Sequence, residues 1–469
     1  MTRLVLLDQA LRLHDNPLLF SGTADNNNGD ATGQNPQQLV AVVCLDKAAY
    51  FSRQYGLQRA NLQRLQQQLQ LIDHTAQALE QFDIGLITLF GEPATEISTL
   101  ARSLQVTDIL AATPHGYREQ QTIALLSERF AVTTLDINSL LGSAELAPEL
   151  PRLPDSFSAF RKQREPLLLV TAALPPFQPQ PGQQWLTPVE TAPFSESFMQ
   201  LAPFRQTSLS AGSSEQQALQ RLNDYIWQHA AISHYKTSRN GLLGDYYASK
   251  FSAALATGSL SVRFCWQQIV QFEQQQLTNE STYWLKFELL WREFFRWQFR
   301  KYGKSWFSKN AIKGPLDFSK PSLNNKQQLK FNNWCAGQSG VPFIDANMRL
   351  LNASGLMSNR GRQNVASYLI HDLGIDWRLG AAYFEQRLLD YDVASNWGNW
   401  SYIAGSGNSG ERQFNVIKQA ISYDSNGDFV RAMLPELSAS GSLIHRPAAH
   451  VTVPGHWHNW LAKLTGPGQ

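Results

Sequence analysis

The sequence predicts an α/β N-terminal domain, built on a parallel sheet of the Rossmann-like kind, followed by an all-α C-terminal domain. Near the N-terminus, short apolar runs alternate with helical stretches, as in buried parallel strands joined by helices. After a Pro-rich connection, the pattern is helical almost throughout, without strand alternation. The predicted units are an α/β domain over 1–140, an interdomain linker over 141–212 and a helical domain over 213–469.

Composition excludes several classes of protein. The net charge of the 469 residues is only +2, so any basic nucleic-acid footprint has to be local. Three scattered cysteines without a CxxC pair argue against a disulfide framework and against a zinc or other metal site. No apolar run approaches membrane-spanning length, and LVLL near the start is too short for a signal peptide. We therefore expect a soluble, cytoplasmic protein with no membrane partner.

The first domain is expected to contain four buried strands and one long helix. The strands are predicted over 4–7, 39–45, 84–90 and 109–112. A Gln-rich helix with one apolar face is predicted over 54–79, and a polar, mobile loop over 21–38. The absence of GxGxxG argues against a dinucleotide site in this domain. The Pro-rich linker is expected to lie over the surface.

The helical domain begins with a predicted helix over 214–230. An aromatic helix follows over 283–302, where Glu288 and Arg292 are spaced i, i+4. The alternative is a surface helix on which Glu288 and Arg292 form an ordinary salt bridge, and this alternative explains Arg292 well. The surrounding aromatic residues leave little polar face, so Glu288 is predicted to point into a cavity.

Ser249, Lys250 and Ser252 stand at a predicted helix start. Free backbone N–H groups and the helix dipole favour a phosphate at such a place. Plain N-capping explains the same residues. The residues alone leave both interpretations open.

The stretch 340–407 carries the strongest signal. A helix is predicted to end at Gly374, and a second one to run over 378–389. Carboxylates, amides and indoles then crowd together, namely Asp390, Asp392, Asn396, Trp397, Asn399 and Trp400. Burying so many polar side chains is costly unless they contact a polar, aromatic ligand.

This stretch, with NRGRQNVASYLI and DWRLGAAYFEQRLLDYDVASNWGNW, closely resembles the flavin-binding part of the photolyase/cryptochrome family, and most of all its DASH branch. LRLHDNPLL matches the family's opening, although the preceding DQA departs from it. The resemblance implies non-covalent FAD in the helical domain and a folate antenna, 5,10-methenyltetrahydrofolate, in the first domain. It assigns FAD contacts to Tyr235, Ser249, Lys250, Phe251, Ser252, Glu288, Arg292, Asn359, Arg362, Asp390, Asp392 and Asn396, and an antenna contact to Glu119.

These residue types suit a reduced flavin. Arg362 can place a permanently charged guanidinium beside the ring, and the resemblance pairs it with Asp390. Asp392 would accept from the pyrimidine edge of the ring. Asn396 falls where the family faces the flavin N5, and an amide does not readily supply a proton. The anionic reduced form is therefore expected to persist.

By resemblance, the chain uses near-UV or blue light to split cyclobutane pyrimidine dimers, preferentially in single-stranded DNA, by an electron from excited reduced FAD. Glu288 would stabilise the dimer radical anion, while Trp291, Gln363 and Tyr402 line the lesion pocket. Gln363 replaces a Met common in duplex enzymes and Tyr402 a stacking Trp, which favours the DASH branch. Arg360 and Arg412 are predicted to bind DNA phosphates. The protein is expected to be a monomer.

Two alternatives remain at this stage. The first is a blue-light-sensing cryptochrome that binds DNA or a protein partner without repair. The second is a light-independent helical nucleic-acid binder, which the polar and aromatic cluster at 390–400 disfavours.

The family reduces its flavin through three Trp residues, and here the sequence departs from the pattern. Trp400 and Trp377 match the first two positions, but Asn324 occupies the third. An amide is not oxidised by a Trp radical. Trp306, Trp334 or a nearby Tyr is the predicted substitute.

Overall fold

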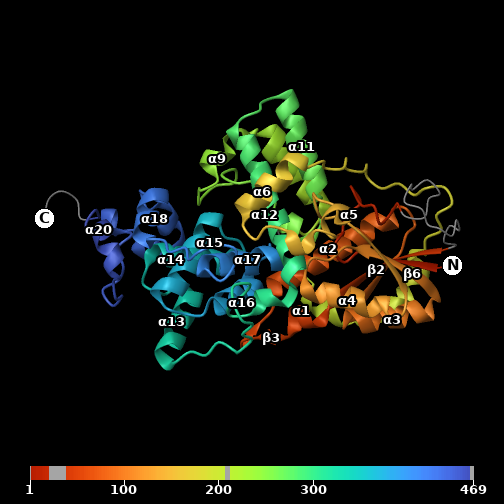
Figure 1. Cartoon of the computed structure of the whole chain (residues 1–469), viewed down its shortest axis with the longest axis horizontal. Helices are drawn as coiled ribbons and strands as arrows, with labels where there is room; N and C mark the ends of the chain where they lie inside the picture. The colour runs from red at the N-terminus through yellow and green to blue at the C-terminus, as the bar shows by residue number, and fades with distance from the viewer. Residues whose placement is uncertain (1, 21–37, 206–211, 465–469) are drawn as a thin grey trace.

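The computed structural model describes residues 2–20, 38–205 and 212–464. The polar loop predicted over 21–38 lies outside the described residues, except for Gln38, which begins a strand. Figure 1 shows the sheet domain at the N-terminal end of the long axis and the C-terminal helices at the other. The fold class is as predicted: an α/β domain followed by a helical one.

A five-stranded parallel sheet forms the first domain, in the order β5-β2-β1-β6-β7. Its strands are β1 Thr2–Leu6, β2 Gln38–Asp46, β5 Leu86–Gly91, β6 Val106–Ala112 and β7 Ala131–Leu135. The four predicted strands are confirmed. The prediction missed β7 because this edge strand has no fully buried residue and lacks a strong apolar run.

Helices cover both faces of this sheet. They are α1 Lys47–Phe51, α2 Leu62–Glu80, α3 Pro93–Ser103 and α4 Tyr117–Ser127. Leu69 and Ile72 of α2 are buried in one core cluster, while Ile97 and Leu100 of α3 are buried in another. The apolar face predicted for the Gln-rich helix is confirmed at Leu65, Leu69 and Ile72, whereas Leu62, the first residue of the helix, is 52% exposed.

The start of that helix was predicted too early. Residues 53–58 form a short antiparallel hairpin, β3 Arg53–Gln54 and β4 Leu57–Gln58. Tyr55 and Gly56 make its turn with φ of 53° and 85°, the left-handed conformation that Gly adopts without strain.

The linker was predicted to lie over the surface, but part of it is folded and packs into the core of the helical domain. It contains α5 Ser143–Leu146, α6 Phe157–Arg164 and α7 Pro188–Thr191, with a 3₁₀ segment over Ala192–Phe204. Phe157 and Phe160, three residues apart on α6, are buried in the core of the helical domain. Leu169, farther along, is 90% exposed. The spacing of the two Phe residues on a polar helix was the signal for this packing.

The helical domain is built around α12, which contacts α6, α9, α11 and α17. Its α-helices are α8 Glu215–Asn223, α9 Tyr235–Ser238, α10 Ser252–Thr257, α11 Val262–Gln275, α12 Glu280–Tyr302, α13 Asn325–Ala336, α14 Pro342–Ser354, α15 Asn359–Ser367, α16 Trp377–Arg387, α17 Val393–Ala404, α18 Val416–Tyr423, α19 Asp428–Met433 and α20 His458–Leu461. The described part of the chain after 212 contains no strand. Gly374 follows a π-turn after α15, with φ of 63°.

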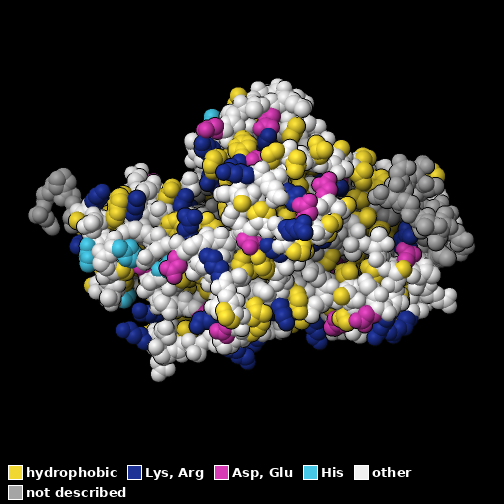
Figure 2. Space-filling view, viewed as in Figure 1, with side chains coloured by type: hydrophobic (Ala, Val, Ile, Leu, Met, Phe, Trp, Pro, Cys, Tyr) yellow, Lys and Arg dark blue, Asp and Glu magenta, His cyan; other side chains and the backbone are white. Residues whose placement is uncertain are grey.

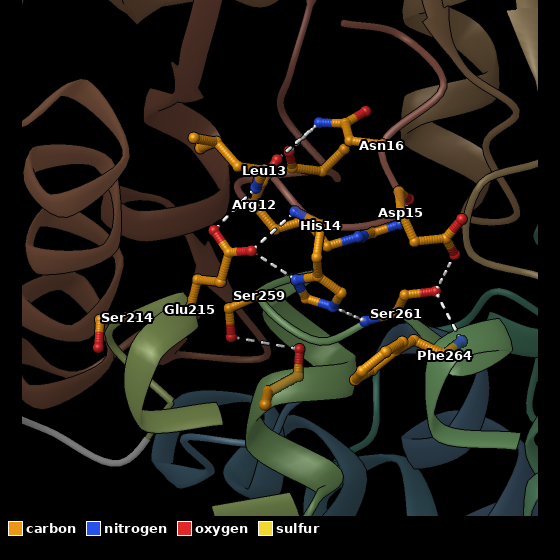
Figure 3. Close-up of polar contacts among 12 residues, drawn as sticks. Arg12, Leu13, His14, Asp15, Asn16, Ser214, Glu215, Ser259, Ser261 and Phe264 are labelled. Carbon is orange, nitrogen blue, oxygen red and sulfur yellow. Dashed lines mark hydrogen bonds and ion pairs between the residues drawn. The ribbon is translucent and has the colours of Figure 1, made fainter. Parts of the chain in front are cut away.

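A buried polar junction joins the two domains, and LRLHDNPLL supplies half of it (Figure 3). The Nδ1 of His14 lies 2.5 Å from a carboxylate oxygen of Glu215, and its Nε2 accepts from the backbone N–H of Ser261 at 3.1 Å. Asp15 forms an ion pair with Arg263 at 2.6 Å. Because these groups satisfy one another across the interface, the LRLHDNPLL segment fixes how the domains meet.

Asp372 gives a testable pH dependence. Its side chain is 2% exposed, and neither carboxylate oxygen has a hydrogen-bond partner in the described structure; His456 faces it at 3.5 Å. Burial raises the pKa of Asp372 to about 7. A raised carboxyl pKa stabilises the fold fully below pH 4, and this stability is lost as the pH rises towards 7. Asp372→Asn is therefore expected to gain about 2 kcal/mol of stability at pH 8, after discounting for residual solvent.

The measurement is the thermal midpoint of both proteins at pH 4 and pH 8. The variant should melt a few degrees above the wild type at pH 8 and close to it at pH 4. An equal shift at the two pH values would contradict the assignment.

Candidate functional site

A cavity of about 1230 Å³ lies within the helical domain. Its walls come from α8, α9, α10, α12, α14, α15, α16, α17 and α19 and from the segment between α9 and α10. All the residues predicted to contact FAD line it: Tyr235, Ser249, Lys250, Phe251, Ser252, Glu288, Arg292, Asn359, Arg362, Asp390, Asp392 and Asn396. Residues up to 161 positions apart in the sequence (Tyr235 and Asn396) thus meet in one place. Their individual roles stay predictions.

The predicted ion pair is present at the start of α15. Arg362 Nη2 donates to Asp390 Oδ2 at 2.7 Å, and its Nε donates to the Met357 carbonyl at 2.9 Å. Asp390 Oδ1 is buried and has no partner in the described structure. A buried carboxylate oxygen without a donor is costly, so this atom suits an N–H group of a bound ligand. A guanidinium donor beside a free carboxylate acceptor fits the polar edge of a flavin ring.

Asp392 is held from both domains. It caps α17 by accepting from Ser395 N at 2.8 Å, while its Oδ2 accepts from His115 Nε2 at 3.0 Å. Arg296 Nη1 lies 3.5 Å from the same oxygen. Burial alone would raise the pKa of Asp392, but His115 and Arg296 hold it well below its ordinary value. The sequence reasoning missed both partners, and neither lies near 392 in the chain.

His115 is neutral in this arrangement. Burial first, and then the neighbouring Arg296, lower its pKa to about 4. Because an ionised carboxylate can only accept hydrogen bonds, the neutral ring donates its Nε2–H to Asp392. Asp392 remains an anion with a fixed orientation at the cavity wall. The same carboxylate has lone pairs left, and with these it would accept the predicted hydrogen bond from the pyrimidine edge of the ring.

Glu288 lines the cavity, as its aromatic helix predicted, and forms an ion pair with Arg239. Burial raises the pKa of Glu288, although Arg239 opposes this. The Arg239 guanidinium also lies 5.3 Å from the centre of the Trp284 ring. Arg239 was missed because nothing in YKTSRNG marks it as the partner of a residue on another helix.

Asn396 projects from α17 and is nearly buried. Its Nδ2 donates one hydrogen bond to the Ala381 carbonyl at 2.9 Å, which leaves the Oδ1 acceptor and one N–H without a partner in the described structure. An amide oxygen accepts hydrogen bonds and has no proton to give. Close packing fixes α17 in place: a Cβ on Gly398 would come 2.3 Å from the Phe295 ring of α12.

The segment before α10 argues against one of the two interpretations of Ser249, Lys250 and Ser252, and the phosphate contact stays a prediction. The N-cap of α10 is Phe251, which makes no side-chain cap hydrogen bond, so the interpretation as plain serine capping is wrong. Lys250 Nζ instead bonds the Gly244 carbonyl and Asp245, both at 3.0 Å. The first-turn N–H groups of α10 are left without a side-chain acceptor, as phosphate binding requires.

The residues predicted for the lesion form an aromatic wall of the same cavity. Trp291 stacks on Phe157 of the linker, with ring centres 3.7 Å apart, and meets Tyr402 edge-on at 5.8 Å. The Arg412 guanidinium lies 5.4 Å from the Tyr402 ring. Gln363 also lines the cavity. Phe157 was not predicted to support this wall.

Arg360 and Glu119, predicted to bind DNA and the antenna, do not line the cavity. Arg360 donates to Gln363, Gln419 and Asn240 at 2.8–3.1 Å, so its guanidinium is bound within the protein. Glu119 lies in the first turn of α4, and its side chain packs over Gly116 at the interface between the domains. The antenna role of Glu119 stays a prediction. Arg360 hydrogen-bonds Gln363 and so positions that side chain at the cavity.

Among the predicted relay residues, Trp400 lines the cavity and Trp377 does not. Trp377 contacts the fully buried Trp397 at 5.8 Å. Asn324, at the position of the family's third Trp, is exposed and caps α13 in a reciprocal capping box with Gln327. Its role here is structural.

The fold and the cavity define a two-domain protein with a large ligand-sized cavity in its helical domain. Residues 3–181 match the family model described as DNA photolyase, and residues 284–458 match the FAD binding domain of DNA photolyase. The chain belongs to the photolyase/cryptochrome family.

Its relatives point to one branch of that family. A cryptochrome DASH of Synechocystis sp. is 37% identical over 460 residues, which cover 95% of this chain and 90% of the relative. A cryptochrome DASH of Xenopus laevis is 38% identical over 462 residues, covering 95% and 84%. The crystal structure of a Synechocystis cryptochrome superposes with a TM-score of 0.82 at 33% identity, covering 99% of this chain and 98% of that one. A class III photolyase of Agrobacterium tumefaciens, 23% identical, shares the fold with a TM-score of 0.75, covering 99% and 91%.

Proposed function

We propose that this chain is a DNA repair enzyme that splits cyclobutane pyrimidine dimers with light, preferentially in single-stranded DNA. One observation carries the proposal: a single cavity is lined by both the predicted FAD contacts and the predicted lesion contacts. An electron can move between two molecules only when they are held close together. A shared cavity meets that requirement.

Bound FAD would supply the light-driven electron. Around it, Arg362 and Asp390 provide a fixed charge pair, and Asn396 offers an acceptor without a proton. Glu288, paired with Arg239, would hydrogen-bond the dimer. The aromatic wall of Trp291 and its neighbours excludes water and offers the pyrimidines an apolar surface.

The aromatic wall also supports the proposed preference for single-stranded DNA. Tyr402 meets Trp291 edge-on and is covered by Arg412, so it offers less stacking area than a Trp in its place. Flipping a dimer out of a duplex costs a few kcal/mol, and single strands avoid most of that cost. A folate antenna near Glu119, a monomeric state and a cytoplasmic location belong to the proposal too. None of the described helices is long and apolar enough to span a membrane.

The test compares repair of the same dimer in single-stranded, looped and duplex DNA under blue light, with one preparation of flavin-loaded protein. We expect the single strand to be repaired fastest and the duplex slowest. Equal rates would refute the strand preference. DNA binding without splitting in any substrate would instead support a light sensor.

DNA affinity is expected to depend on a local set of basic residues. Lys and Arg are spread among Asp and Glu over the face shown in Figure 2, so no broad positive field is available there. Arg412 is exposed at the cavity rim, whereas Arg360 is bound internally. Arg412→Gln should reduce the log–log salt slope for single-stranded DNA by roughly 0.7, the value for one phosphate contact.

The matched control is Arg360→Gln, which should leave the slope unchanged even if affinity falls. Both slopes come from fluorescence-anisotropy titrations at several salt concentrations. A reduced slope in Arg360→Gln and not in Arg412→Gln would reverse the assignment.

A further inference from the structure

We propose that His115, in the first domain, is a positioning residue for the flavin: it holds Asp392 as an oriented anion at the cavity wall and thereby sets the reduction potential of the bound cofactor. The inference rests on the proposed flavin site and is independent of dimer repair. It makes the first domain part of the cofactor site, although the cavity lies within the helical domain.

His115 reaches the site from the loop between β6 and α4. This loop passes close to the first residue of α17, because a Cβ on Gly116 would come 3.2 Å from Val393 Cγ1. An alanine at 116 would crowd that side chain, so glycine allows the close approach. His115 is 8% exposed, and its contact with Asp392 is therefore shielded from water.

Asp392 is oriented by donors on both of its oxygens. Oδ1 accepts from the backbone N–H of Ser395 at 2.8 Å, and Oδ2 accepts from His115 Nε2 at 3.0 Å. Arg296 Nη1 is farther away, 3.5 Å from Oδ2. In the described structure, His115 is thus the only side chain that donates a hydrogen bond to Asp392.

A neutral donor suits this position. Arg296 is buried beside both residues, so one cation already balances the charge of Asp392. The imidazole adds a hydrogen bond without adding a charge, because burial and Arg296 lower the pKa of His115 to about 4. A lysine there would place a second buried cation beside Arg296, at a large cost in desolvation. The imidazole fixes the direction of the carboxylate and leaves the charge balance intact.

The charge of Asp392 bears directly on the cofactor. Charged groups beside a flavin tune its electronics. A carboxylate anion opposes the addition of negative charge to a neighbouring ring, so a charged Asp392 lowers the reduction potential and a protonated one raises it. Burial raises the pKa of Asp392, and His115 is the largest of the influences that lower it. Without His115, Asp392 should therefore take up a proton more readily.

The other charged groups that face Asp392 come from α12. They are Arg292 and Arg296, and Arg296 in turn faces Glu293 and Arg300 of the same helix. Arginine keeps its charge across neutral pH. Asp392 is therefore the group whose charge is expected to change when His115 is removed.

The test measures the midpoint potential of the bound flavin in wild-type and His115→Leu protein, without DNA, at about pH 8 and about pH 5.5. Leucine fills the space and cannot donate. We expect a more positive potential in the variant, with a difference that grows as the pH falls, because Asp392 then gains its proton. Flavin affinity should fall by about tenfold, since a buried acceptor loses its donor. Unchanged potential and affinity would overturn the proposal.

His115→Gln is the rescue variant. Its amide nitrogen can occupy the place of the imidazole Nε2 and donate to Asp392, although glutamine does not titrate. This variant should restore both the potential and the affinity to values near those of the wild type. A potential that stays shifted in His115→Gln would mean that the ring matters rather than the hydrogen bond, and would contradict the proposal.

His14→Leu is the matched control. His14 is also buried at the domain interface and lies 2.5 Å from a carboxylate, that of Glu215, but neither residue lines the cavity. This variant should lower the thermal midpoint and keep the wild-type potential. An equal shift of potential in the His14 and His115 variants would show that a loosened interface is the cause, which refutes a specific role of His115. If His115→Leu does not fold, His115→Met takes its place, because the flexible, unbranched methionine adapts to the space and also lacks a donor.

Failure of this proposal is distinguishable from failure of the proposed function. Wild-type protein that binds flavin but splits no dimers in light would refute repair, and the comparison of potentials would still stand. Efficient dimer splitting together with an unchanged potential in His115→Leu would refute the positioning role and leave repair intact.

Discussion

Replacing Arg362 by Ala is expected to release the flavin from the protein. The substitution leaves Asp390 as a buried carboxylate without its charge partner, in a position where Oδ1 already lacks a donor from the chain. Asp390 is 2% exposed but Arg362 is 29% exposed, so losing this half-buried pair is expected to cost about 2 kcal/mol and to lower flavin affinity by about 30-fold. The measurement is flavin absorbance per protein after gel filtration.

The control is Arg349→Ala. Arg349 also forms an ion pair with a carboxylate, Glu436 at 2.7 Å, but both side chains are substantially exposed. Exposed pairs contribute about 0–1 kcal/mol, so this variant should retain flavin like the wild type. Equal retention by the Arg362 variant would mean that the pair does not hold the cofactor.

Glu288→Gln is expected to reduce dimer splitting by about tenfold or more while flavin stays bound. Glutamine keeps the shape of the side chain and removes the charge that pairs with Arg239. Arg239 is then free to rotate, and the hydrogen bond predicted for the dimer is lost or reversed. The measurement is the repair rate at saturating substrate with chemically reduced protein.

Glu280→Gln is the matched control because Glu280 lies on the same helix, is largely exposed and pairs with Lys236. It should repair at the wild-type rate. A Glu288 variant that behaves like this control would remove Glu288 from the reaction.

Much of the fold was predictable because its signals are local. The four predicted strands are apolar runs, and α12 is an aromatic helix capped at Asn279. The hairpin at Tyr55 was missed because a two-residue turn breaks a Gln-rich pattern that otherwise looks helical. Edge strand β7 was missed because none of its residues is fully buried and it lacks a strong apolar run.

The cavity residues were predictable for another reason. The cluster from Asp390 to Trp400 is too polar and aromatic for a dry core, and the family resemblance then supplied its partner Arg362. Partners from distant segments left no mark in the sequence. His115 reaches Asp392 across the domain interface, and Arg239 meets Glu288 from another helix.

The predicted electron-relay residues also show that contacts between distant segments cannot be found from the sequence. The sequence shows that Asn324 cannot be oxidised, but it cannot rank Trp306 against Trp334. Only the packing of α13 against α16 and α17 does so, because it brings Trp334 to Trp400. The capping role of Asn324 also became visible only in the structure.

The central claim is that one cavity holds both the flavin and a pyrimidine dimer. The most direct measurement is the recovery of pyrimidine absorbance when reduced, flavin-loaded protein and an excess of dimer-containing single-stranded DNA are exposed to blue light. The account predicts many dimers split per protein, with no consumption of reductant and no recovery in the dark. Recovery that stops at one dimer per protein, or that does not occur in light, would contradict it.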